Sequence, residues 1–60
     1  MNGNNIINLV NSISTNYSLT QEQTSELVRK YQQDTRNIDM IKREVENIAN
    51  YYTHQNKLST

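Results

Sequence analysis

The chain of 60 residues contains no cysteine, which excludes a disulfide framework. Its single histidine, His54, cannot form a structural zinc site without cysteine partners. A domain of this size buries only about 60% of the surface that its unfolded chain exposes. We therefore expect one domain, residues 1–60, stabilised by helix packing, by self-association or by a larger protein from which it was excised.

Proline is absent and the only glycine is Gly3, so the strongest signals that interrupt a helix are missing. Hydrophobic residues make up 33% of the chain, below the roughly 45–50% of typical domains, a figure that includes glycine. No segment alternates as a strand does, and no internal repeat is present. The composition favours an all-α fold with a small core beneath a surface rich in asparagine and glutamine.

The charge of the chain is balanced, because six basic and six acidic residues are interspersed. Such a chain has no broad positive field that would collect phosphates, so we do not expect general nucleic-acid binding. The apolar run near the N-terminus lacks a preceding Lys or Arg and is interrupted by Asn8 and Asn11. It is typical of neither a signal peptide nor a membrane span. We expect a cytoplasmic protein, and the Asn, Ile, Lys and Tyr usage suggests a low-GC bacterium.

Apolar residues recur at steps of three and four and predict three helices, over residues 4–15, 20–33 and 38–54. Side chains of the segment STNYSLT compete for backbone hydrogen bonds and end the first helix. Thr20 and Gln23 form a capping box for the second, with Ser18 and Gln21 as an alternative two residues earlier. Asn37 caps the third helix, and the final HQNKLST is expected to fray.

The third predicted helix carries the longest apolar stripe, formed by Ile38, Ile41, Val45, Ile48 and Tyr52. One interpretation is that the stripe packs on the other two helices and closes a small three-helix bundle with a long C-terminal helix. The other is a coiled-coil seam, since the same residues occupy two heptad positions. Both can hold together if the C-terminal half of the helix extends beyond the bundle. The bundle interpretation predicts a core that includes Ile6, Val10, Ile13, Leu27, Val28, Ile41, Val45 and Ile48.

Asn16 and Tyr17 follow the first predicted helix, and Asn37 opens the third with Ile41 and Val45 four and eight residues later. This pattern covers about half of the chain and resembles the small ubiquitin-associated domain (UBA) and its bacterial relatives. In that family a glycine–aromatic pair ends the first helix, and here asparagine stands in place of the glycine. The resemblance implies a three-helix bundle that binds other proteins, with Tyr17 at the aromatic position.

The third predicted helix, about 24 Å long, should extend beyond the second, which is about 20 Å long. Its last turn carries Ala49, Tyr51 and Tyr52, which we interpret as a contact patch for a protein, a peptide or a second copy of the chain. Adjacent tyrosines are about 100° apart on a helix. Tyr52 continues the stripe, and Tyr51 is either a partner anchor or a half-buried ring with its hydroxyl in water.

No constellation for catalysis, metal or cofactor binding can be assembled from this sequence. His54 has no nucleophile or orienting group at a recognisable spacing, and we expect it to be exposed to solvent. Glu44 and Glu46 are two residues apart and face different sides of the helix, so they are expected to be solvated. We therefore expect a non-enzymatic protein without metal or cofactor.

The sequence is compatible with three functional hypotheses. The first is a protein interaction module that serves as an accessory or terminal domain of a larger protein. The second is a DNA-binding regulator of helix-turn-helix type, in which Arg36, Lys42 and Arg43 would contact DNA. Acidic residues on the same helix and the zero net charge oppose this hypothesis. The third is a small helical oligomerisation domain that associates weakly through its last helix.

Overall fold

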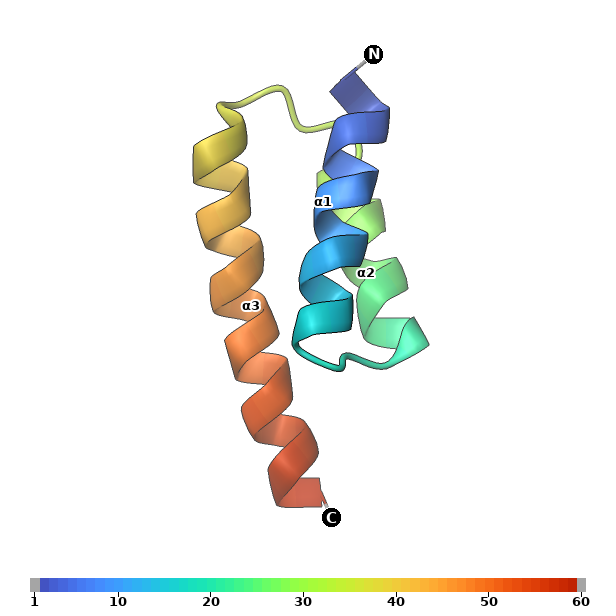
Figure 1. The fold of residues 1–60 in the computed structure, drawn as a ribbon, viewed down its shortest axis with the longest axis vertical. Coiled ribbons are helices and arrows are strands. Elements are labelled where there is room, and N and C mark those ends of the chain that lie inside the picture. The colour runs from blue at the N-terminus through green and yellow to red at the C-terminus, as the bar shows by residue number, and fades with distance from the viewer. Residues whose placement is uncertain (1, 60) are drawn as a thin grey trace.

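The computed structural model describes residues 2–59, and the side chains of residues 5–58. Three helices account for most of this range: α1 (Asn2–Asn16), α2 (Gln21–Tyr31) and α3 (Ile38–Ser59). Helices α1 and α3 run in the same direction and α2 returns between them in the sequence (Figure 1). No residue of the described range forms a strand. The predicted fold class, a small all-α bundle with a long C-terminal helix, is confirmed.

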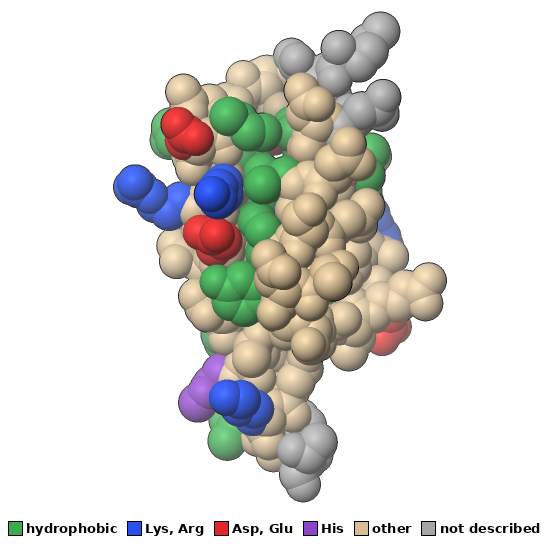
Figure 2. Space-filling model, viewed as in Figure 1, with side chains coloured by type: hydrophobic (Ala, Val, Ile, Leu, Met, Phe, Trp, Pro, Cys, Tyr) green, Lys and Arg blue, Asp and Glu red, His purple; other side chains and the backbone are tan. Residues whose placement is uncertain are grey.

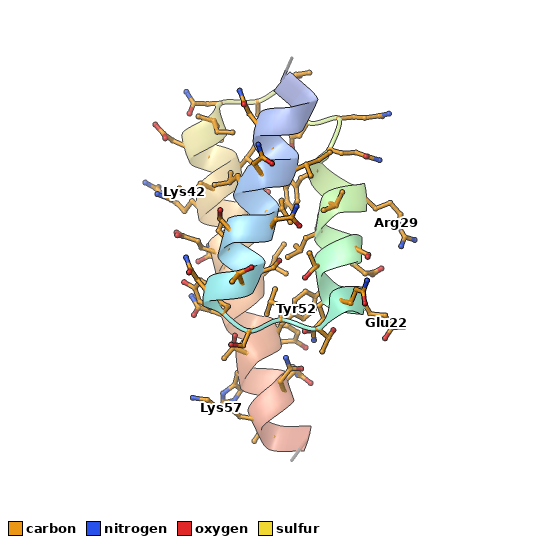
Figure 3. The ribbon with its side chains drawn as sticks, turned by 45° about the vertical axis from the view of Figure 1, so that its right-hand side comes forward. Glu22, Arg29, Lys42, Tyr52 and Lys57 are labelled. Carbon is orange, nitrogen blue, oxygen red and sulfur yellow. The ribbon has the colours of Figure 1, made fainter. Side chains whose placement is uncertain are left out.

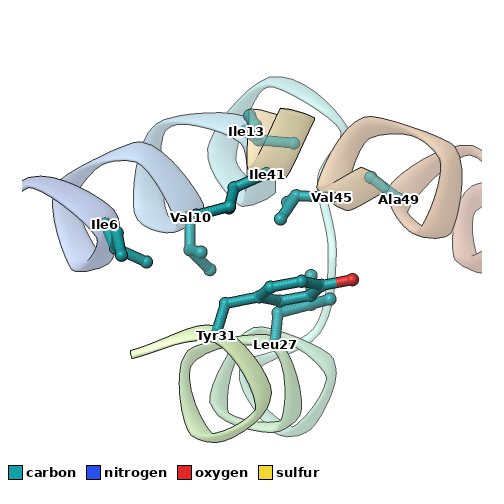
Figure 4. Packing of buried hydrophobic residues seen from close by; sticks show 8 residues of the cluster. All are labelled: Ile6, Val10, Ile13, Leu27, Tyr31, Ile41, Val45 and Ala49. Atoms are coloured by element: carbon teal, nitrogen blue, oxygen red, sulfur yellow. The ribbon is translucent and has the colours of Figure 1, made fainter. Parts of the chain in front are cut away.

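The core lies where the three helices meet (Figure 4). Its buried members are Ile6, Val10, Ile13, Leu27, Tyr31, Ile41, Val45 and Ala49. Six of the eight predicted core residues are among them, whereas Val28 and Ile48 are only partly buried against this cluster. Tyr31 and Ala49 complete the core, and Tyr31 and Leu27 are the buried residues of α2.

The apolar stripe of α3 packs inside its own domain. Ile41 and Val45 are 0% exposed, whereas Ile38, at the start of the stripe, is 45% exposed. A stripe whose central residues are already covered by α1 and α2 cannot also form a coiled-coil seam with another chain. The coiled-coil interpretation of these residues is therefore wrong.

Helix α1 ends at Asn16, one residue later than predicted, because a C-terminal cap satisfies its last carbonyl groups. The amide of Ser18 donates to the carbonyl of Thr15 at 3.2 Å, and the amide of Leu19 donates to the carbonyl of Ser14 at 2.9 Å. This pair of bonds is the Schellman motif, which requires a left-handed residue at the position of Ser18. Ser18 adopts that conformation, with φ of 55°.

Ser18→Gly is expected to raise the free energy of unfolding by about 0.5–1 kcal/mol. A side chain with a Cβ atom is strained in the left-handed region, whereas glycine enters it freely. Urea unfolding followed by circular dichroism measures the change. The matched control is Ser25→Gly, an exposed position inside α2, which is expected to lower stability by a similar amount. If Ser18→Gly does not stabilise the protein, the left-handed conformation of Ser18 is not strained.

The predicted cap of α2 is confirmed. The amide of Gln23 donates to Oγ1 of Thr20 at 3.1 Å, and the amide of Thr20 donates to Oε1 of Gln23 at 3.0 Å. The helix ends at Tyr31, two residues before the predicted end, with Gln32 as its C-cap. The amide of Asp34 then bonds the carbonyl of Tyr31 at 2.9 Å and turns the chain toward α3.

The start of α3 agrees with the prediction, but its end does not. Oδ1 of Asn37 accepts a hydrogen bond from the amide of Asp39 at 2.8 Å and caps the helix. The helix then continues to Ser59, beyond the predicted end at residue 54. With 22 residues, α3 is about 33 Å long, whereas α2, with 11 residues, is about 17 Å long.

Two polar contacts hold the C-terminal part of α3 against the rest of the chain. Oγ1 of Thr53 donates to the carbonyl of Tyr17 at 3.2 Å. The side-chain amides of Gln23 and Asn56 exchange two hydrogen bonds, at 3.0 and 3.1 Å. These contacts oppose fraying of the helix at residue 54. Contacts with residues more than 30 positions away explain why residues 54–59, which were expected to fray, are helical. Thr60, the last residue of the segment predicted to fray, lies outside the described residues.

Candidate functional site

A groove of about 520 Å³ lies between α2 and α3. We call it the α2–α3 groove; its lining residues are Glu26, Leu27, Arg29, Lys30, Ile48, Tyr51 and Tyr52. Leu27 is buried and Ile48 is partly buried, so the groove has an apolar base that belongs to the outer edge of the core. Tyr52 lies between α3 and the N-terminal end of α2 (Figure 3).

The two adjacent tyrosines of α3 form the aromatic side of this groove. Their ring centroids are 6.2 Å apart, with an interplanar angle of 53°. Tyr52 packs against the core, whereas Tyr51 is 60% exposed. The hydroxyl of Tyr51 accepts a hydrogen bond from Nε2 of Gln55 at 3.0 Å. An exposed ring held at both its base and its hydroxyl is a suitable contact for a partner, because little conformational freedom is lost on binding.

The opposite side of the α2–α3 groove is charged. Arg29 and Lys30 belong to the last turn of α2, where cations are favoured by the helix dipole. The ammonium of Lys30 lies 5.7 Å from the ring centroid of Tyr31. Both ion pairs found among the described residues belong to Arg36, which leaves Arg29 and Lys30 outside such pairs. With Glu26 as the one anion, the lining carries one net positive charge.

A second groove, of about 610 Å³, lies between α1 and the connection from α2 to α3. Its apolar residues are Ile6, Leu9 and Ile38, and its polar residues include Asp34 and Arg36. Hydrophobic side chains are visible along the junction of α1 and α3 on this face of the molecule (Figure 2). The charged residues of this groove already bind one another, so they offer less to a partner than Arg29 and Lys30 do.

Arg36 connects the α2–α3 loop to α3 through two carboxylates. Its guanidinium donates to Oδ2 of Asp34 at 2.7 Å and to Oε2 of Glu44 at 2.8 Å. The hydroxyl of Tyr31 also donates to Oε1 of Glu44, at 2.9 Å. Glu44 was predicted to be solvated, and its side chain is 41% exposed, but it also binds Tyr31 and Arg36, which the sequence did not predict. The spacing of these residues in the sequence contains no signal for the cluster, because the turn of the loop brings them together.

The pKa values in this cluster are shifted by the same contacts. Hydrogen bonds from Arg36, and then the one from Tyr31, lower the pKa of the Glu44 carboxyl. The hydrogen bonds from Arg36 also lower the pKa of Asp34. Burial, and then the hydrogen bond to Glu44, raises the pKa of Tyr31 from 10.0 to about 12. The cluster is therefore formed at neutral pH with both carboxylates ionised and Tyr31 protonated.

The thermal midpoint of the protein is expected to fall in acid more steeply than that of Arg36→Gln. Asp34 and Glu44 have lowered pKa values in the folded state. Their stabilisation is complete above the unfolded pKa, about 4, and is lost as the pH falls through the folded values. Circular dichroism melts between pH 7 and 2 measure the difference, and Lys42→Gln is the control for the lost charge. Parallel midpoint curves for the protein and Arg36→Gln would show that the ion pairs do not contribute.

The structure separates the residues predicted to form the contact patch. Tyr51 and Tyr52 line the α2–α3 groove together, alongside α2 and not beyond its end. Tyr17 is partly buried against the core at the end of α1 and lines neither groove described above. Ala49 is 0% exposed. Its assignment to the contact patch is wrong, because its helical position places it on the core side of α3.

The residues predicted to contact DNA also differ in their surroundings. Arg36 is held by Asp34 and Glu44, whereas Lys42 and Arg43 are exposed on α3. Lys42 projects from the side of α3 that faces away from α2 (Figure 3). The prediction from sequence missed the groove residues of α2. Arg29 and Lys30 could be recognised as surface cations, but nothing in the sequence places them in the same groove as Tyr51.

Comparison of the chain with models of protein families, with curated proteins and with solved structures finds no match. Among the residues that the structure describes, no helix combines the length and apolar character needed to cross a membrane. The same residues contain no group of three or more His, Cys, Asp or Glu side chains that could hold a metal ion. The geometry of the α2–α3 groove is therefore the basis for a functional proposal.

Proposed function

We propose that this protein is a non-enzymatic interaction module that binds a protein or peptide in the α2–α3 groove. The observation that carries the proposal is the exposed ring of Tyr51 beside the apolar base formed by Leu27 and Ile48. Tyrosines in such positions are enriched among the residues that dominate binding energy. A cytoplasmic accessory or terminal domain of a larger protein is the setting that we propose for this module.

The chemistry of the groove favours a short amphipathic helix as the bound segment. Such a helix would place an aliphatic or aromatic side chain between Tyr51 and Ile48, in the manner of other helix-in-groove complexes. An acidic residue of the same segment would reach Arg29 or Lys30. Charge complementarity at this edge would set orientation and association rate more than affinity.

The resemblance to ubiquitin-associated domains supports this proposal at the level of architecture and selects the first partner to test. In the present structure Asn37 caps α3, and Ile41 and Val45 are core residues. The left-handed residue that closes α1 is Ser18, and Asn16 is helical. We therefore propose that any ubiquitin-like partner binds at the α2–α3 groove rather than at the connection that follows Tyr17.

Titration of the isotopically labelled protein tests the proposal by nuclear magnetic resonance. Probes are ubiquitin-like proteins, acidic amphipathic helical peptides and duplex DNA. The expected result is a response of Leu27, Ile48 and Tyr51 to a protein or peptide probe. Tyr51→Ala and Arg29→Glu should each weaken binding at least about fivefold, the change that defines a significant contact residue. The thermal midpoint should barely change in Tyr51→Ala, because this residue is exposed. Arg29→Glu should lower it by only a few degrees, because a cation in the last turn of α2 is replaced by an anion.

The control is Lys42→Ala, an exposed position on the side of α3 away from α2. It should leave peptide binding unchanged. Salt-sensitive binding to duplex DNA that is lost in Lys42→Ala with Arg43→Ala would overturn the proposal in favour of a DNA-binding regulator. Binding of a protein probe that is insensitive to both Tyr51→Ala and Arg29→Glu would overturn the assignment of the groove.

A further inference from the structure

Three large hydrophobic residues of α3 remain exposed on one line of the helix surface. Met40 is 54% exposed, Tyr51 is 60% exposed and Leu58 is 71% exposed. Met40 and Tyr51 are separated by about three whole turns of the helix, and Tyr51 and Leu58 by about two. At 100° per residue, the three side chains lie within about 20° of a common line. Met40 and Leu58 line neither groove described above, so this line is a feature separate from both.

The line is part of a regular pattern that we call the outer seam. Its positions alternate at steps of four and three residues, as the core positions of a coiled coil do. The outer seam consists of Met40, Glu44, Asn47, Tyr51, His54 and Leu58. Five of these residues are exposed, and the side chain of Glu44 is 41% exposed. None of them belongs to the buried core.

The order of residues in the outer seam is complementary to itself in the antiparallel direction. Steps of four, three, four, three and four read the same from either end. A second copy running in the opposite direction therefore places Met40 opposite Leu58, Glu44 opposite His54, and Asn47 opposite Tyr51. In this register the first pair is apolar on both sides, the second joins a carboxylate to an imidazole, and the third joins an amide to a phenol.

We propose that the chain forms an antiparallel homodimer through the outer seam of α3. A parallel arrangement would place Glu44 opposite Glu44, where like charges repel. The zero net charge of the chain means that two copies have no long-range repulsion to overcome. Because the core contains few residues and no disulfide supports it, additional apolar burial at this seam would stabilise the fold.

The contacts that Glu44 already makes are compatible with this arrangement. A carboxylate offers about four acceptor sites. Tyr31 and Arg36 donate three hydrogen bonds to the two oxygens of Glu44, so one site remains for an N–H group of His54 from the second copy. A dimer with a single helix from each chain buries a small interface, at the low end of specific complexes. We therefore expect a weak dimer whose population depends on concentration.

Sedimentation equilibrium of the full chain up to millimolar concentration tests the proposal. The expected result is a reversible dimer. Met40→Lys and Leu58→Lys should each weaken it at least about tenfold, which corresponds to about 1.4 kcal/mol. Both positions are exposed, so the helix content and thermal midpoint of the monomer should be retained. Lys42→Glu, on the side of α3 away from α2, is the matched control and should leave dimerisation unchanged.

Disulfide formation tests the direction of the two helices, because the natural chain has no cysteine. The antiparallel register should bring the Cα atoms of residue 40 and the second copy's residue 58 to about 4–7 Å, the range that a disulfide spans. Oxidation of a mixture of the Met40→Cys and Leu58→Cys proteins should therefore give mainly the mixed disulfide. Met40→Cys alone should remain largely uncrosslinked.

Three results would overturn the dimer proposal. They are a monomer at every concentration, a dimer unaffected by both lysine substitutions, and preferential disulfide formation of Met40→Cys with itself. None of these results bears on the proposed function, because Met40 and Leu58 lie outside the α2–α3 groove. Conversely, Arg29→Glu lies outside the outer seam and reports on the groove alone. Tyr51 belongs to both surfaces and is therefore excluded from the dimer test.

Discussion

Ile41→Ala is expected to lower the free energy of unfolding by about 2–4 kcal/mol. Ile41 is 0% exposed and lies at the centre of the stripe through which α3 contacts the other two helices. The free energy of unfolding of native proteins is about 5–15 kcal/mol, and a core this small places this protein near the lower end of that range. The variant is therefore expected to be partly unfolded at room temperature. Urea unfolding followed by circular dichroism measures the loss.

Ile38→Ala is the matched control, because it removes the same atoms from the same helix. Ile38 is 45% exposed, so its truncation leaves a smaller cavity and is expected to cost about 1 kcal/mol or less. Equal losses at the two positions would contradict the assignment of Ile41 to the core. An unchanged midpoint in Ile41→Ala would contradict the packing of α3 against the other helices.

Ala49→Leu is expected to lower the free energy of unfolding by about 1–3 kcal/mol, through overpacking. Ala49 is 0% exposed and belongs to the core cluster. Three additional carbon atoms at this position must displace a neighbouring helix or force neighbouring side chains out of their preferred rotamers. A thermal melt followed by circular dichroism measures the effect.

Asn50→Leu provides the control for Ala49→Leu, since it introduces the same side chain one residue later at an exposed position. It is expected to change stability by about 0.5 kcal/mol or less. This pair of variants also separates two accounts of Ala49. If Ala49 were part of an exposed contact patch, Ala49→Leu would be as well tolerated as Asn50→Leu, and the structural account would be wrong.

Tyr51 connects the two proposals, because it lies at the edge of the α2–α3 groove and in the middle of the outer seam. A peptide in the groove and a second chain on the seam would both contact the same ring. We therefore expect a bound peptide to weaken dimerisation. Sedimentation equilibrium with and without a peptide that binds the groove measures this coupling.

The features that the sequence alone determined are local ones. The periods of three and four predicted three helices, and a capping box at Thr20 and an asparagine cap at Asn37 were correctly located. Both caps depend on residues no more than three positions apart, so their signals are contained in short segments. Six core residues were predicted for the same reason, since each stripe marks its own inward face.

The features that only the tertiary structure decided depend on contacts between distant residues. The end of α3 at Ser59 depends on bonds from Thr53 and Asn56 to Tyr17 and Gln23. The burial of Ala49 and the role of Glu44 depend on how α1 and the α2–α3 loop are placed against α3. Periodicity shows that one face of a helix is apolar, but not which helix covers it or how far that cover extends. The α2–α3 groove and the outer seam are the surfaces of α3 that α1 and α2 leave exposed, so only the packing of the helices reveals them.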